Sequence, residues 1–154
     1  MSANADIRSA IVTVMQAVPD IGVVQDRERY AKNLPDLKTF YATPTLGLRG
    51  WFVRRLAVAE RDRVLPRSNE YTRWRIQGLM AFDDAASSEL VFDDLIEQLR
   101  DAFRTNDTLN GTVSQCALPD GSDAGLQLLD TGTVSFAGVV CHSARLQLTT
   151  QRIL

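Results

Sequence analysis

The stretch TRWRIQGLMAF, residues 72–82, constrains the fold most, because apolar and polar side chains alternate along most of it. Neighbouring side chains of a β-strand point to opposite faces, so this alternation indicates a strand with one buried face and one polar face. The residues expected on the buried face are Trp74, Ile76, Gly78, Met80 and Phe82. The residues expected on the polar face are Arg73, Arg75 and Gln77.

Residues 51–61, WFVRRLAVAER, are also rich in strand-forming side chains. The two strands are separated by the polar segment DRVLPRSNEY, residues 62–71. Strand-forming runs that flank one polar segment predict an antiparallel hairpin, here with a long loop. In contrast, residues 25–50 mix charges, prolines, glycines and aromatic residues with no sustained period, which predicts a long functional or mobile loop.

Two segments have the spacing of amphipathic helices. Residues 5–18 carry apolar side chains at helical intervals and end before Pro19. The second helix follows Ser87 or Ser88, either of which can cap it, and should end between Asn106 and Gly111. Its apolar stripe consists of Phe92, Leu95, Ile96, Leu99, Ala102 and Phe103.

Two or three strands are expected after this helix, in VSQCAL, LQLLDTGTVSF and GVVCHSARLQLTTQ, with a turn at PDGSDAG. The order of elements is therefore helix, hairpin, helix and further strands. This order predicts an α+β fold with a mostly antiparallel β-sheet and two main helices packed on one face. A chain of 154 residues should form one domain, spanning residues 1–154.

The net charge of −2 conceals two neighbouring blocks of opposite sign. Residues 49–82 contain eight arginines against three acidic residues, and residues 83–107 contain eight acidic residues against two arginines. Arginine tolerates partial burial at interfaces because its planar guanidinium pairs bidentately and is weakly hydrated. The basic hairpin and the acidic helix can therefore pair with each other, either within one subunit or between two subunits.

No motif for catalysis is complete. Cys141 and His142 are adjacent on a predicted strand, so without a bulge they point to opposite faces. GTVSFAG lacks the tight G-x-S-x-G turn of a nucleophile elbow. DGSDAG resembles a calcium loop but places Ala124 and Thr131 at ligand positions. We therefore expect His142 in the packed face, Cys116 and Cys141 as buried thiols, and neither enzymatic activity nor a cofactor.

A metal site and a nucleic-acid site remain as alternatives. Asp93 and Glu97 lie one helical turn apart and can hold a cation together, although a helical wheel places them on the solvent side with Asp101. The basic hairpin suits the phosphates of nucleic acid. Trp74, however, is expected on the face opposite Arg73 and Arg75. Base stacking and phosphate contact would therefore need different faces of the strand.

No stretch approaches the roughly 20 apolar residues of a membrane span. The N-terminal segment MSANADIRSAIVTVMQAV has an acidic residue where a signal peptide has basic ones. We therefore expect the chain to fold in a cytoplasm, without a membrane partner.

The order of four segments resembles that of the tail-completion proteins of tailed bacteriophages and prophages, and in particular the tail terminator group. The segments cover nearly the whole chain: IRSAIVTVMQAVPDIGVVQDRERY, GWFVRRLAVAERD, RWRIQGLMAFDDAASSELVFDDLIEQLRDAFRTNDTLNG and GVVCHSARLQLTTQ. The most characteristic phrase is FDDAASSELVFDDLIEQLRDAFR. The resemblance rests on the order of elements and on such phrases.

This resemblance implies a structural protein of the virion, located at the junction of tail and head. Its subunits would form a ring, usually a hexamer, that caps the tail tube, stops its polymerisation and presents a surface to the head. The implied partners are the tail tube protein, a head-completion protein, and DNA that passes through the lumen without sequence readout. A stopper or neck protein of the head-tail connection is the nearest alternative, and a nucleic-acid-binding module is a more distant one.

A head-to-tail ring needs two different complementary surfaces on each subunit. The residues expected to form subunit or partner contacts lie in the long loop, the basic hairpin and the acidic helix. They are Tyr30, Phe40, Tyr41, Arg54, Arg61, Arg63, Arg67, Asp93, Glu97 and Asp101.

Overall fold

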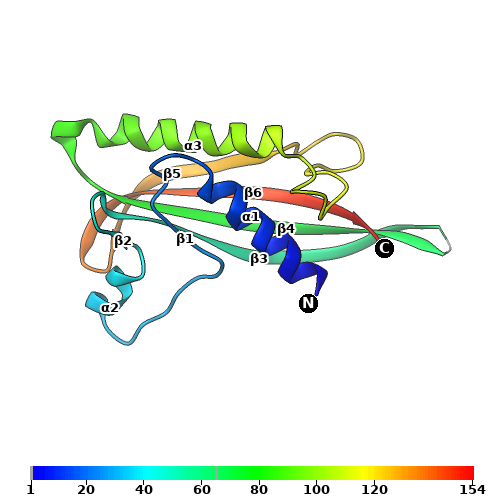
Figure 1. The fold of residues 1–154 in the computed structure, drawn as a ribbon, viewed down its shortest axis with the longest axis horizontal. Helices are drawn as coiled ribbons and strands as arrows, with labels where there is room; N and C mark the ends of the chain where they lie inside the picture. Colours follow the sequence, from blue (N-terminus) through cyan, green and yellow to red (C-terminus); the bar gives the residue numbers. More distant parts are fainter. Residues whose placement is uncertain (1, 65) are drawn as a thin grey trace.

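The computed structural model describes residues 2–64 and 66–154, and the side chains of these residues except 62 and 63. The elements follow one another largely in the predicted order, as Figure 1 shows. They are α1 (Ala3–Gln16), β1 (Val23–Gln25), α2 (Leu34–Thr39), β2 (Ala42–Thr43), β3 (Gly47–Val64), β4 (Arg67–Ala81), the 3-10 helix η1 (Asp84–Ala86), α3 (Ser88–Thr105), β5 (Leu126–Phe136) and β6 (Val139–Ile153).

The strands form one sheet in the order β1-β3-β4-β6-β5, and β2 pairs with the beginning of β3. Only β1 runs parallel to its neighbour, and the other pairs are antiparallel. The predicted α+β fold, with a mostly antiparallel sheet and two main helices, is therefore confirmed.

Both long helices cover the same face of the sheet. In Figure 1, α1 crosses the strands diagonally and α3 runs alongside β5 and β6. Trp51 and Trp74 are fully buried between the sheet and the helices. The indole of Trp51 donates to the backbone oxygen of Ile21 at 2.8 Å, and that of Trp74 donates to Thr150 Oγ1 at 3.1 Å. Phe82, expected on this buried face, is 46% exposed because it follows the end of β4.

The opposite face is covered at one end only, by α2, β2 and the residues around them. A second apolar cluster lies there, formed by Tyr41, Leu48, Phe52, Leu79 and Cys141. Beyond this cluster the second face presents polar side chains. The sheet is therefore covered unequally, and much of its second face is open to contact.

The predicted hairpin loop at residues 62–71 is wrong, because β3 and β4 continue through most of it. Arg67 pairs with Val64, and Glu70 pairs with Glu60. This part of the hairpin extends past the helices in Figure 1, so few of its side chains have a core to pack against. Polar residues stand on both faces here, and without apolar alternation the sequence does not indicate a strand.

The predicted long loop at residues 25–50 is also only partly correct, because it contains α2, β2 and the start of β3. Asn33 caps α2 by accepting the backbone N–H of Asp36 at 2.9 Å. The Gln25 amide then ties the segment to β1 by donating to the Phe40 carbonyl at 2.8 Å. Elements this short span too few residues to produce a recognisable period.

Two other local predictions are corrected at the ends of elements. Ser87 precedes α3 but has a φ of 55° and makes no capping hydrogen bond through its side chain. Ser88 instead accepts the backbone N–H of Asp83 at 3.0 Å. The strand expected at VSQCAL is a series of turns, with one isolated bridge between Gln115 and Gln151.

Candidate interaction surfaces

The outer edge of β3 is open over most of its length. β1 pairs only with residues 50–52 of this strand, and no described strand pairs with the same edge between residues 53 and 64. Apolar side chains on this segment lie in solvent: Leu56 is 41% exposed, Val58 45% and Val64 74%. An open strand edge that carries exposed apolar side chains readily pairs with another chain. We call residues 53–64 the open β3 edge.

A basic pocket lies at the beginning of the open β3 edge. It has a volume of about 510 Å³. Its lining consists of Arg8, Arg27, Glu28, Arg29, Tyr30, Val53, Arg54 and Arg55. Five of these eight residues are arginines and only one is acidic, so the pocket favours an anionic partner.

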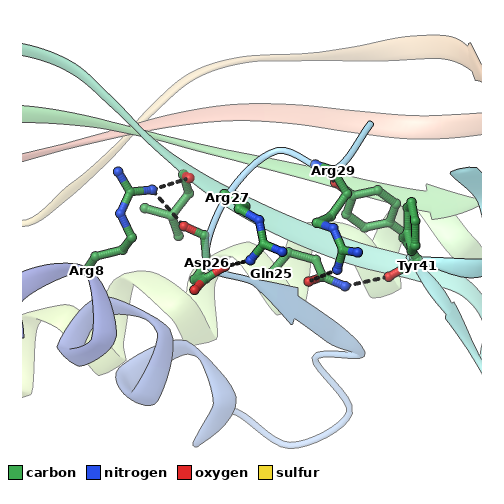
Figure 2. A network of polar contacts seen from close by, with 8 residues as sticks. Arg8, Gln25, Asp26, Arg27, Arg29 and Tyr41 are labelled. Carbon is green, nitrogen blue, oxygen red and sulfur yellow. Dashed lines mark hydrogen bonds and ion pairs between the residues drawn. The ribbon is translucent and has the colours of Figure 1, made fainter. Parts of the chain in front are cut away.

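The arginines of the basic pocket are held by short contacts, several of which Figure 2 shows. Arg8, on α1, donates to the backbone oxygens of Asp26 at 2.7 Å and Val53 at 3.2 Å. Burial lowers the pKa of Arg8, and the nearby Asp26 acts in the opposite direction. Arg27 pairs with Asp26 at 2.7 Å, and Arg54 pairs with Glu28 at 3.3 Å. The guanidinium groups are therefore positioned before any partner arrives.

The three aromatic residues expected at a contact surface have different environments. Tyr30 is 76% exposed and donates to Glu28 at 2.9 Å, at the rim of the basic pocket. The Arg29 guanidinium lies over the ring of Phe40, with its carbon 4.1 Å from the ring centroid. Tyr41 is only 1% exposed and accepts the backbone N–H of Arg29 at 3.1 Å. The expectation for Tyr41 is therefore corrected, because it packs inside its own subunit.

The other end of the sheet is formed by β5, the last strand in the order. Its outer edge has no partner strand among the described residues. Leu128 is 43% exposed, Leu129 47% and Val134 38%. This edge therefore shares two features with the open β3 edge: no described strand pairs with its backbone, and apolar side chains lie in solvent.

Helix α3 places carboxylates beside β5. Arg100 of α3 donates to the Leu126 carbonyl of β5 at 3.2 Å, which identifies the side of the helix that faces this strand. Glu89 and Asp93 share that side, because at about 100° per residue both fall within roughly 20° of Arg100. Both residues are exposed, and neither forms an ion pair with a described residue. We call β5 together with Glu89 and Asp93 the acidic edge.

The remaining acids expected at contacts are neutralised on α3 itself. Glu97 pairs with Arg100 at 3.1 Å, and Asp101 pairs with Arg104. Among the described residues, no ion pair joins α3 to the hairpin. No group of three metal-binding side chains was found among the described residues.

The uncovered face of the sheet carries a row of arginines. Arg54 lies directly opposite Arg75 across β3 and β4. Arg145 of β6 lies on the same face and pairs with Asp130, whose pKa is lowered by this hydrogen bond. Arg73 is exposed on that face as well. Trp74 is buried on the opposite face, as the alternation predicted.

The arginines near the hairpin turn form a smaller exposed group. Arg61 and Arg67 are exposed on the part of the hairpin that extends past the helices. The side chain of Arg63 lies outside the described residues. Positions far from the core leave these side chains free to contact a partner above or below the sheet.

Cys141 and His142 point to opposite faces, as predicted. Cys141 is buried in the second apolar cluster, whereas His142 Nε2 lies 2.8 Å from Ser88 Oγ. The His142 ring also packs against Phe92 at a centroid distance of 5.8 Å. Burial raises the pKa of the Cys116 thiol to about 12, so this thiol stays protonated. Cys116, Cys141 and His142 therefore all pack against other side chains of their own subunit.

The apolar residues of the two open edges were missed as contact candidates. Leu56 and Leu129 each lie where the strand register shifts, between residues 55 and 57 and between residues 128 and 130. In the sequence, such a bulge appears as two similar residues in succession, as in LQLLD. Two similar residues in succession, within an otherwise alternating strand, were therefore the sequence signal that could have indicated these two positions.

None of the helices in the described part of the chain is both long and apolar enough to cross a membrane. Comparison with family models and with curated protein sequences gives no match for the chain.

Proposed function

We propose that this protein is a structural subunit that assembles head to tail into a ring and acts as a tail terminator. One observation carries the proposal. The sheet ends in two open edges of unlike chemistry, a basic one beside β3 and an acidic one beside β5 and α3. Two different complementary surfaces on one chain are what a head-to-tail assembly requires.

Repetition of such a contact produces either a closed ring or an open filament, depending on whether the rotation between copies closes. A tail terminator corresponds to the closed case. The resemblance in element order supports this choice, together with the implied position at the junction of tail and head. In that ring, α+β subunits cap the tail tube, stop its polymerisation, and leave a lumen for DNA.

The tail tube protein and the head-completion protein need surfaces that the ring contacts leave free. The hairpin end with Arg61 and Arg67 extends along the strand direction, past both long helices. Helix α2, whose residues do not line the basic pocket, offers a second exposed surface at Leu34, which is 56% exposed. Both surfaces are suited to contacts above or below the plane of a ring.

The mass of the purified protein in solution tests the assembly. Six chains of 17.1 kDa give about 100 kDa, the mass expected for a closed hexamer. Negative-stain images should show rings with a central opening. A monomer at every concentration would contradict the proposal.

A capping assay tests the terminator role itself. Tail tubes are assembled from the tube protein of the same virus, with and without this protein. We expect a ring at one end of each tube and no further growth from that end. A stopper or neck protein would leave tube growth unchanged, so continued growth would favour that alternative.

A further inference from the structure

We infer that the acidic edge of one copy docks on the open β3 edge and basic pocket of the next copy, so that the sheet continues from subunit to subunit. The inference rests on the proposed assembly and specifies the surface that makes it. The occupant of the basic pocket is therefore a second copy of this chain.

The backbone of the two edges supports strand pairing. β5 has 11 residues, and the open β3 edge spans residues 53–64, so the two segments are similar in length. Three antiparallel steps separate β3 from β5 in the sheet, from β3 to β4, to β6 and to β5. If copies share one orientation along the strands, β5 of one copy runs antiparallel to β3 of the next. The junction then has the same geometry as the rest of the sheet.

Exposed apolar side chains on both edges supply the buried area of this junction. Val58 and Leu56 stand on the β3 side, and Leu128 and Leu129 stand on the β5 side. Each of the four side chains is between 41% and 47% exposed in the single chain. Burial of apolar surface is the main favourable contribution to association. Pairing the edges removes these side chains from water and also satisfies the backbone groups of both strands.

Charge complementarity gives the junction its direction. Arg55 points to the helix-covered face, because it lies opposite Trp74 in the register. Arg8 projects from α1 on that same face. Glu89 and Asp93 of α3 lie beside β5, also on the helix-covered face. Antiparallel pairing of the two segments therefore brings unpaired acids of one copy toward arginines of the next.

The register across the sheet adds a geometric consequence. Arg54 is level with Arg75, then with Gln147 and Gln127, so the open β3 edge and β5 extend in opposite directions from one level. Copies joined through these edges are therefore offset along the strands. A closed ring accommodates such an offset when the strands tilt relative to the ring axis, as in other closed sheets.

Cross-linking between introduced cysteines tests the junction directly. The variant carries Val58→Cys and Leu129→Cys, and it is treated with a short bismaleimide and run on a denaturing gel. We expect a ladder of covalent oligomers that ends at the ring size, because every copy carries both halves of the junction. An equimolar mixture of the two single variants should stop at dimers. Cys116 and Cys141 are buried, so the unmodified chain should give no ladder.

A matched control carries Val58→Cys and Leu34→Cys, the latter at an exposed residue of α2, a helix that the inferred junction does not include. It should give no ladder. Rings in the mass measurement without a ladder from the Val58→Cys and Leu129→Cys variant would overturn the inference and leave the proposed function standing. A chain that forms no rings at all would overturn both.

Discussion

Gly78 shows how a single residue fixes the packing of the core. A side-chain carbon at this position would lie 2.2 Å from the ring of Trp51, which is fully buried. We expect Gly78→Ala to lower the free energy of unfolding by about 1–3 kcal/mol, because overpacking forces a buried side chain from its place. Urea unfolding of the two proteins measures the difference.

Gly132, on β5, serves as the control for this substitution, because a side-chain carbon there meets no atom within 4 Å. Gly132→Ala should leave stability unchanged or raise it by less than about 1 kcal/mol. Equal stability of the Gly78→Ala variant and the unmodified protein would show that Trp51 does not occupy this space.

Cys116 links stability to alkaline pH. Burial raises the pKa of its thiol from 9.0 to about 12 in the folded chain. Above pH 9 the unfolded thiol loses its proton and the folded thiol keeps it, so the free energy of unfolding falls as pH rises toward 12. The loss approaches about 1.4 kcal/mol per pH unit for one such group.

The variant Cys116→Ala isolates this contribution from the other groups that titrate at high pH. Urea unfolding at several pH values between 8 and 11 should give a steeper decline for the unmodified protein than for the variant. Parallel declines would mean that the Cys116 thiol is not buried in the folded state.

The start of α3 shows how an element is anchored without a conventional cap. Ser88 is 5% exposed and links the N–H of Asp83 to His142. Ser88→Ala should lower the free energy of unfolding by about 1–3 kcal/mol, because it removes two partly buried hydrogen bonds, each of which contributes about 0.5–1.5 kcal/mol. Ser87→Gly should instead raise it by up to about 1 kcal/mol, because glycine adopts the positive φ of 55° without strain. Thermal and urea unfolding distinguish the two; destabilisation by Ser87→Gly would contradict this account.

At the scale of elements, the sequence predicted the helices and strands that pack along the main apolar core. The alternation around Trp74 and the stripe around Phe92 both reflect contact with one buried layer. The hairpin end and residues 25–50 have no such layer on one side or are too short for a period, so sequence patterns did not reveal β2, α2 or the extension of β3. For the candidate site, the sequence predicted only that a basic hairpin and an acidic helix could pair. It did not predict that Arg8 of α1 lies beside Arg55 of β3, because residues so far apart in the chain are brought together only by the tertiary structure.

For the whole molecule, nucleic-acid binding is the alternative to a structural role, because the uncovered face of the sheet carries several arginines. If that face binds phosphates, a labelled duplex should bind at low salt, and affinity should fall steeply as salt rises. Our account predicts no such binding by the free protein, whose net charge is −2. Fluorescence anisotropy measures it. Tight binding that Arg73→Ala and Arg75→Ala abolish together would favour the alternative.

The whole-molecule claim is that unlike edges join copies head to tail, and charge reversal tests it most directly. One variant carries Arg55→Glu, which reverses the charge on the helix-covered face of the open β3 edge, and the other carries Glu89→Lys and Asp93→Lys on the same face. Each variant alone presents like charges at both sides of the junction, which disfavours association. In a mixture, the two kinds of subunit can alternate with complementary charges at every junction.

The decisive measurement is the solution mass of these proteins at equal concentration. We predict a ring of about 100 kDa for the unmodified chain, smaller species for each variant alone, and a restored ring with an even number of subunits for the mixture. Rings of unchanged mass from both single variants, or no recovery in the mixture, would contradict assembly through these edges.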